Sequence, residues 1–349
     1  MYLSADTLDD LLIRVYKRLL RRRGAAEINP SKGQATELNG VLLHIRQPRA
    51  RLSRTERKGT FFSCLGEFLW YLSGTDEVAF IEYYIRGYDK FSDDGKTIFG
   101  AYGPRLFGQN GTNQVENVIT TLKARPDSRR AVIQLFHGED LAADIAARRK
   151  DIPCTCTLQF SIRSGRLHLL VMMRSNDAYM GLPHDVFAFT MLQEIVARSL
   201  KVELGSYKHA VGSLHLYATN TRDAEAYIEE GVQARVEMPP MPYGDPTPSI
   251  RKLLKAEQSI RAGRFPALGA LDPYWADLAR LLQVFRISKR RPTLENRKRV
   301  VRIKKEMHSD IYETYILKRE LRMARHAESL EPLLFDKAEL DAQQAPPSV

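Results

Sequence analysis

The chain has 349 residues and a formal net charge of +11 at neutral pH. Its composition, 44% hydrophobic and 27% charged, is that of a soluble globular protein, and no apolar run is long enough to span a bilayer. Three cysteines are odd in number and unsuited to a disulfide framework, and their spacing matches no zinc motif. We therefore expect a cytoplasmic protein without a bound metal.

The first part of the chain predicts helices and a Gly-rich loop. Residues 5–23 have apolar residues at helical spacing, broken by charges, which is unlike a secretory signal. The stretch FFSCLGEFLWYLSG, residues 61–74, predicts an apolar helix that Gly74 ends and that a single acid, Glu67, interrupts. The Gly-rich and aromatic stretch 87–108 predicts an irregular loop.

The following part predicts a sheet. Residues 125–136 predict a turn and then a strand, and the alternating residues 156–175 predict a hairpin around a Ser-Gly turn. Residues 184–202 predict a long buried helix, and residues 207–220 predict another strand. These elements together predict an α/β protein with a central sheet.

The chain changes character after about residue 238. The Pro-rich stretch EMPPMPYGDPTPS predicts a linker, and charged helical segments follow it. Between Arg286 and Arg325 there are fourteen Lys and Arg residues and only five Asp and Glu residues. A solvated helical face is the plain interpretation, and contact with nucleic acid or another acidic partner is the alternative. We expect two regions, 1–238 and 239–349.

Four short stretches contain the residues that could take part in catalysis or ligand binding. They are DSRR at 127–130, PC at 153–154, RSNDAYMGLPHD at 174–185 and HLY at 215–217. Arginines that converge from these stretches would bind a dianion, because the guanidinium fork matches phosphate oxygens. The same cations would lower the pKa of Cys154 and favour its thiolate. Taken alone, such a cysteine is more often a buried structural residue.

These stretches also carry a resemblance to a known family. In sequence order, GEFLWYLSG, AYGPR, DSRR, PCTCTLQF, RSNDAYMGLPHDVFAF and HLYATN resemble the thymidylate synthase and deoxycytidylate hydroxymethylase family over roughly residues 1–225. The resemblance implies a homodimeric α/β (α+β) enzyme with a twisted mixed sheet flanked by helices. It implies shared active sites that bind a pyrimidine nucleoside monophosphate and 5,10-methylenetetrahydrofolate. Region 1–238 is then the catalytic domain, and region 239–349 is a Pro-rich connector with a basic helical extension.

The resemblance assigns roles to single residues. Cys154 is implied to attack C6 of the pyrimidine, Glu67 to organise water and proton transfer near the base, and Tyr102 to assist proton removal from C5. Asp177 is implied to meet the pterin of the folate. Phosphate and sugar ligands are implied at Arg174, Ser175, Lys32, His215 and Tyr217, with Arg129 and Arg130 lent by the other subunit.

Asp185 departs from thymidylate synthases, which have asparagine at this position, and matches the cytidylate hydroxymethylases. A protonated carboxyl would donate to N3 of cytosine and accept from its N4 amino group. The alternative role for Asp185 is that of an N-cap for a helix beginning near Val186.

A second departure concerns water. Tyr88 and Asp151 stand where thymidylate synthases have the tryptophan and leucine that screen the exocyclic methylene. A polar Asp151 would admit or orient a water that attacks this methylene, which gives a hydroxymethyl product. The alternative is that Asp151 is a simple surface acid.

We therefore expect hydroxymethylation of CMP or dCMP at C5. One alternative is methylation of dUMP, as in thymidylate synthase. The other is a catalytically idle nucleotide- or nucleic-acid-binding protein on the same fold, against which the presence of Cys154 argues.

Overall fold

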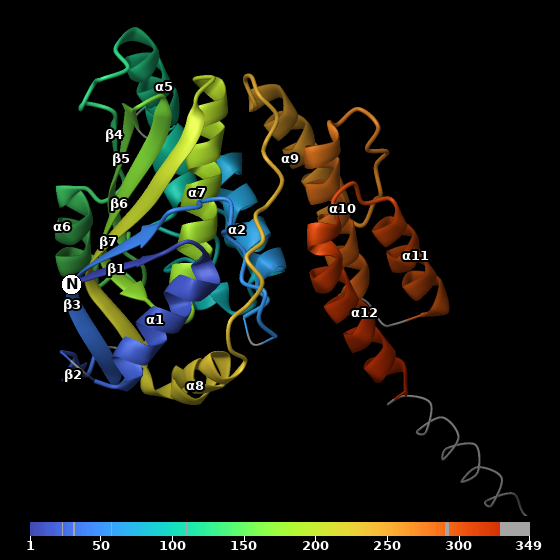
Figure 1. Ribbon diagram of the computed structural model, residues 1–349, viewed down its shortest axis with the longest axis horizontal. Coiled ribbons are helices and arrows are strands. Elements are labelled where there is room, and N and C mark those ends of the chain that lie inside the picture. The colour runs from blue at the N-terminus through green and yellow to red at the C-terminus, as the bar shows by residue number, and fades with distance from the viewer. Residues whose placement is uncertain (23, 31, 57, 109–110, 290–292, 329–349) are drawn as a thin grey trace, which may run out of the picture. The chain divides into compact units, whose positions relative to one another are not determined.

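The computed structural model describes residues 1–349 except 23, 31, 57, 109–110, 290–292 and 329–349 (Figure 1). The chain divides into two compact units, Met1–Leu254 and Lys255–Val349. These units differ from the predicted regions because the Pro-rich segment packs within the first unit. Met238 and Met241 are buried there, and the Met241 backbone N–H donates to Glu194 Oε1 at 3.0 Å.

Among the described residues, a mixed sheet of seven strands forms the centre of the first unit. The strands are β1 (Tyr2–Ala5), β2 (Ala26–Ile28), β3 (Ala35–Ile45), β4 (Val132–Gln134), β5 (Thr155–Arg163), β6 (Arg166–Asp177) and β7 (Glu203–Tyr217). Their order is β1-β3-β7-β6-β5-β4, with β2 paired to β3. The pairs β1–β3 and β6–β7 are parallel and the others antiparallel. The predicted α/β fold with a mixed sheet is confirmed.

Helices surround this sheet. They are α1 (Leu8–Leu20), α2 (Phe61–Ser73), α3 (Val78–Tyr84), η1 (Tyr88–Phe91), α4 (Tyr102–Phe107), α5 (Gln114–Ala124), α6 (Gly138–Ala147), α7 (Leu182–Ser199), η3 (Ala218–Asn220) and α8 (Thr221–Glu229). Helix α7 packs on β6 and β7, and α2 packs on α7, so both lie on one side of the sheet (Figure 1). Because α7 is covered by the sheet and by α2, nearly all its side chains are buried, as its apolar sequence predicts.

The predicted helix over 61–74 is confirmed as α2, and Gly74 ends it with a left-handed φ of 70°. The predicted irregular loop over 87–108 is wrong in part, because it contains η1 and α4. Tyr102 and Leu106 of α4 are buried, and α4 packs on α2. Tertiary packing thus overrides the low helix propensity of this Gly-rich stretch.

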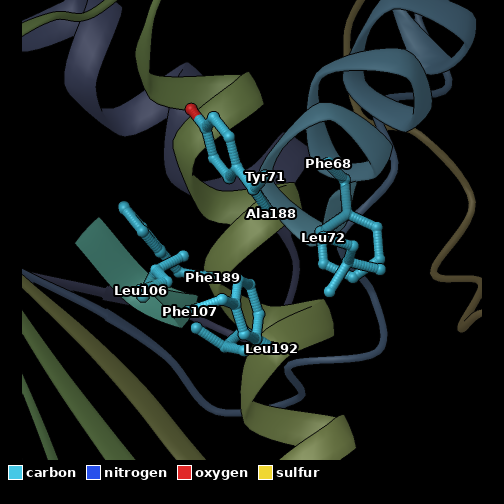
Figure 2. A pocket seen from close by; sticks show the side chains of 8 residues that line it. All are labelled: Phe68, Tyr71, Leu72, Leu106, Phe107, Ala188, Phe189 and Leu192. Atoms are coloured by element: carbon cyan, nitrogen blue, oxygen red, sulfur yellow. The ribbon is translucent and has the colours of Figure 1, made fainter. Parts of the chain in front are cut away.

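An apolar pocket lies between α2, α4 and α7 (Figure 2). Its lining consists of Phe68, Tyr71, Leu72, Leu106, Phe107, Ala188, Phe189 and Leu192. Apart from the Tyr71 hydroxyl, these side chains carry no polar atom, and none of the predicted site residues is among them. The pocket therefore lacks the groups that would bind a nucleotide.

The second unit is helical. It contains α10 (Pro273–Ser288), α11 (Leu294–Lys305), η4 (Asp310–Tyr312) and α12 (Glu313–Glu328), while α9 (Thr247–Arg261) runs across the division between the units. Trp275 and Leu278 of α10 are buried, as are Val300 of α11 and Ile316 of α12. In the part of the chain that the structure describes, every helix is too short or too polar to cross a membrane.

Candidate active site

The ends of three neighbouring strands bring the predicted site residues together. In the parallel pair β6–β7, Ser175 is opposite Ser213 and Asp177 is opposite His215. Strand β5 begins directly after Cys154, whose carbonyl accepts from the Arg174 backbone N–H at 2.9 Å. Cys154, Arg174 and His215, which are far apart in the sequence, therefore lie at one edge of the sheet.

Arg174 is in direct contact with Cys154. Its Nη2 lies 3.7 Å from the Cys154 Sγ. The same guanidinium donates from Nε to the Pro153 carbonyl at 3.0 Å and from Nη2 to the Ile152 carbonyl at 2.9 Å. These carbonyls fix the cation beside the sulfur.

The pKa of the half-buried Cys154 thiol is raised, so the predicted lowering is wrong for this chain. Burial is the largest cause, because it disfavours the charged thiolate. Arg174 and Lys32 act in the predicted direction, but the acidic Asp151 and Asp185 oppose them. The cations that sequence patterning identified are present, and desolvation outweighs them.

Arg129 and Arg130 lie on the surface before β4, and both are exposed. The Arg130 backbone N–H donates to Ser128 Oγ at 3.2 Å, and Gln159 Nε2 donates to the Arg129 carbonyl at 3.4 Å. Among the described residues, no carboxylate lies within 4.0 Å of either guanidinium. Two unpaired surface guanidiniums suit the predicted contribution to the site of another copy.

Two buried carboxyls, Glu67 on α2 and Asp185 on α7, lie beside this edge. Glu67 is 8% exposed, and the Tyr71 hydroxyl donates to its Oε1 at 3.0 Å. Asp185 is 9% exposed, and its Oδ2 accepts from Asn176 Nδ2 at 2.7 Å. Burial raises the pKa of Asp185 to about 7, and burial with the Asp185 charge raises the pKa of Glu67 to about 8. Both groups therefore exchange protons near neutral pH.

The alternative role of Asp185 as an N-cap near Val186 is wrong. Helix α7 begins earlier, at Leu182, and the Asp185 backbone N–H donates to the Gly181 carbonyl at 3.0 Å. Asp185 thus lies in the first helical turn, and its side chain reaches Asn176 on β6.

Asn176 is a site residue that sequence reasoning missed. It is 3% exposed, and its amide also contacts Met173 Sδ at 2.8 Å. Its Oδ1 has no hydrogen-bond partner among the described residues. The available signal was a strongly polar residue at a buried position of an alternating strand.

A second link between the acid-bearing helices also escaped the sequence analysis. His184 Nε2 lies 3.0 Å from Ser63 Oγ, and His184 Nδ1 lies 3.0 Å from the Met180 carbonyl. Ser63 lies one turn before Glu67 on α2, and His184 directly precedes Asp185 on α7. The contact therefore joins the two helices next to their carboxyls.

Asp151 is half-buried, in a position that a glycine makes possible. A Cβ added to Gly100 would lie 2.4 Å from Asp151 Oδ2. Burial raises the pKa of Asp151, while the charge of Lys32 lowers it. Lys32 is itself exposed, with its Nζ 4.5 Å from the centre of the Phe91 ring. These contacts argue against a simple surface acid.

Tyr88 and Tyr102 approach the same acids. The Tyr88 ring packs edge-on against Trp70, with 5.7 Å between the ring centres, and burial raises its pKa, with Glu67 and Asp151 adding to this effect. The Tyr102 hydroxyl accepts from the Thr155 backbone N–H and side-chain Oγ1, each at 3.0 Å. Because two donors occupy its lone pairs, the Tyr102 O–H remains able to donate outward.

The C-terminal ends of β6 and β7, at this same edge, carry the remaining predicted residues. The rings of His215 and Tyr217 are 4.9 Å apart at 81°. Asp177 Oδ1 accepts from the Tyr179 and Met180 backbone N–H groups at 2.8 and 3.0 Å. Asp177 therefore holds the turn that leads into α7.

Lys58 is a buried cation that no sequence signal indicated. It is 3% exposed, with its Nζ 3.9 Å from the centre of the Tyr179 ring and 3.7 Å from Met180 Sδ. Burial lowers its pKa to about 8. Within the described part of the chain no carboxylate pairs with it at 4.0 Å or less.

Comparisons with known proteins show which sequences this chain resembles. The sequence model of the family described as thymidylate synthase matches residues 36–251, which include every predicted site residue except Lys32. Three curated relatives are each named deoxyuridylate hydroxymethyltransferase. The one from Delftia phage PhiW-14 is 30% identical over 214 residues, 58% of this chain and 59% of the relative. The one from Bacillus phage SP01 is 33% identical over 217 residues, which are 58% of this chain and 55% of the relative. The one from Pseudomonas phage M6 is 34% identical over 177 residues, 50% and 50%. The chain therefore spans between half and three fifths of the length of these relatives.

Proposed function

The chain belongs to the thymidylate synthase family, since the family match covers more than half of it. On that premise we propose that it transfers a one-carbon unit from 5,10-methylenetetrahydrofolate to C5 of a pyrimidine nucleoside monophosphate. The observation that carries the proposal is the contact between Cys154 Sγ and the Arg174 guanidinium, beside two buried acids that titrate near neutral pH.

Cys154 is the nucleophile in this proposal. The thiol loses its proton to solvent, and the thiolate forms a bond to C6 while the electron pair of the C5–C6 double bond moves to C5. C5 then attacks the one-carbon unit, as the carbon–nitrogen π pair returns to the folate nitrogen. After loss of the C5 proton, tetrahydrofolate leaves, water adds to the exocyclic methylene, and the sulfur departs from C6 to restore the ring double bond. Protonated Asp185 supplies a proton to the base as this charge develops, and Glu67 relays protons through water. Tyr102 assists removal of the C5 proton. The phosphate dianion of the substrate would bind Arg174, the same cation that contacts the Cys154 sulfur.

The remaining predicted residues hold the two substrates. Phosphate and sugar contacts are proposed for Arg174, Ser175, Lys32, His215 and Tyr217, with Arg129 and Arg130 from the second subunit of a homodimer. Asp177 is proposed to meet the pterin, and Tyr88 to border the one-carbon unit.

Regions 1–238 and 239–349 remain the proposed catalytic domain and extension, and a cytoplasmic location is proposed with them.

We infer a hydroxymethyl product. Asp151 is half-buried near Cys154, where it would orient a water toward the exocyclic methylene, and water addition there leaves tetrahydrofolate unoxidised. The names of the three relatives, which are hydroxymethyltransferases, support this inference.

The identity of the pyrimidine base, cytosine or uracil, is the most specific part of the proposal. Asp185 favours cytosine, because a protonated carboxyl complements the acceptor at N3 and the donor at N4. The relatives are named for deoxyuridylate, which favours uracil as the second candidate. A nucleotide-binding protein without activity is the third, and the buried acids around Cys154 argue against it because each raised pKa costs stability.

The deciding experiment offers CMP, dCMP and dUMP, each tritiated at C5, with 5,10-methylenetetrahydrofolate. We expect tritium release and a 5-hydroxymethyl product with dCMP or CMP, and neither in Cys154→Ala. A 5-methyl product with dihydrofolate would refute the hydroxymethyl assignment, and preference for dUMP would refute the cytosine assignment. Absence of tritium release with all three nucleotides would refute the enzymatic proposal.

Mixed dimers test the shared site. Cys154→Ala and the double variant Arg129→Ala/Arg130→Ala should each be inactive alone. Random mixing makes half of the dimers mixed, each with one intact site, so about a quarter of the wild-type activity should return. No recovery in dimers shown to have exchanged subunits would contradict the arginine assignment.

A further inference from the structure

Helix α11 in the second unit concentrates positive charge. Its twelve residues include six basic residues and one acid, Glu295, which lies in the first turn. The helix is held to its own unit by Val300 and Ile303, both buried. Lys298, Arg302 and Lys305 follow one another at i, i+4 and i+7, on the side of the helix opposite these two residues.

We define Lys298, Arg302 and Lys305 as the basic row. All three side chains are exposed. Among the described residues, none of the three has a carboxylate within 4.0 Å. Neighbours on one helical face with like charge repel each other. Arg302 and Lys305 lie in the last turn of α11, where the helix dipole favours cations, but this leaves all three side chains free to meet an anion from outside the unit.

Other cations of the same unit are paired, which makes the contrast informative. Arg280 lies 3.1 Å from Asp277 and 3.8 Å from Glu306. Lys304, the neighbour of Lys305 in the sequence, lies 3.5 Å from both Glu313 and Glu320. Carboxylates are thus available in this unit, and they serve the cations that flank the core rather than the basic row.

The geometry of the row fits a linear polyanion. Seven residues separate its ends, which corresponds to about 10 Å along the helix axis. A duplex presents one phosphate charge for every 1.7 Å or so of its axis, so three cations at this spacing find phosphates without any base contact. The described side chains of α11 include no aromatic ring for stacking, which argues against recognition of unpaired bases.

A membrane surface fits less well. The apolar side of α11, formed by Val300 and Ile303, is buried inside its own unit and is not available to a lipid surface. Leu294 and Val301 are exposed next to the row, at 66% and 41%, but two side chains do not form the apolar face of an interfacial helix. We propose that the basic row binds the sugar–phosphate backbone of double-stranded nucleic acid without sequence preference.

The test compares two variants of the full chain with equal net charge. Lys298→Gln/Arg302→Gln/Lys305→Gln removes the row, and Lys17→Gln/Lys123→Gln/Lys201→Gln removes three exposed lysines of the first unit. Binding of a fluorescent duplex DNA of about 20 base pairs is followed by anisotropy between about 50 and 300 mM NaCl, a range over which counterion release is measurable. Circular dichroism checks that each variant is folded.

We expect the row variant to lose roughly 2 to 3 units from the slope of log Kobs against log salt, since each phosphate contact contributes about 0.9. The control variant should keep the wild-type slope. Equal loss in both variants would show a general charge effect and overturn the proposal, as would an unchanged slope in the row variant. Binding to vesicles of phosphatidylserine and phosphatidylcholine without binding to DNA would overturn it in favour of a membrane surface. DNA binding is measured without nucleotide turnover. A failure of the proposed catalytic activity would therefore neither support nor overturn the binding proposal.

Discussion

Replacing Asp185 by asparagine tests the electrostatics of the site without removing its shape. Burial raises the pKa of this carboxyl from 3.8 to about 7. Between these values the folded state keeps a proton that the unfolded state has lost. The favourable contribution of the Asp185 carboxyl to the free energy of unfolding is complete below about pH 4. It disappears as the pH rises through about 7, where the buried carboxyl must ionise. The difference of about three pKa units corresponds to roughly 4 kcal/mol.

Asparagine does not titrate, and its carbonyl oxygen can still accept from Asn176. The variant should therefore gain free energy of unfolding relative to the wild type as pH rises from 5 to 8, by roughly 2 to 3 kcal/mol, because the unfolded carboxyl is already mostly ionised at pH 5. Urea unfolding at both pH values measures this gain, with Asp127→Asn, an exposed acid, as the control. An equal difference between variant and wild type at pH 5 and at pH 8 would refute the buried-acid reasoning.

The same substitution should change the choice of base. An amide pairs with N3–H and O4 of uracil, whereas a protonated acid pairs with cytosine. One mismatched buried hydrogen bond costs about 1–3 kcal/mol, so the kcat/KM ratio of dUMP to dCMP should rise at least about fivefold. A ratio that stays constant would mean that Asp185 does not contact the base.

Three further predictions concern its neighbours. Asn176→Ala removes a hydrogen bond that lowers the pKa of Asp185, so the alkaline limb of the kcat/KM profile should move up by about one pH unit, and a downward shift would contradict the assignment. Gly100→Ala places a methyl group 2.4 Å from Asp151 Oδ2, so product analysis should show a smaller hydroxymethyl fraction, and an unchanged fraction would remove Asp151 from the chemistry. Cys154→Ser should bind nucleotide in calorimetry within about threefold of the wild type yet release no tritium, and sustained release would exclude the sulfur as nucleophile.

The sequence predicted the elements whose signals are local. The apolar run ending in Gly74 became α2, and the alternating residues on both sides of Ser164 and Gly165 became β5 and β6. Because strand ends meet at a sheet edge, the motifs containing Cys154 and Arg174 could be expected to meet as well.

Features that depend on burial could not be read in the same way. The pKa of Cys154 is raised because desolvation exceeds the effect of nearby cations, and the sequence contains no measure of desolvation. Helix α4 was missed because its contacts with α2 exist only after folding. Lys58 is one lysine in a polar loop by sequence, and only the fold encloses it under Tyr179.

The surface position of Arg129 and Arg130 has a consequence for how the protein must be assayed. If these guanidiniums serve a second copy, a solitary chain carries an incomplete catalytic centre. Specific activity would then fall upon dilution below the dissociation constant of the pair, and rate would vary with the square of protein concentration in that range. Cellular abundance would itself act as a control on turnover.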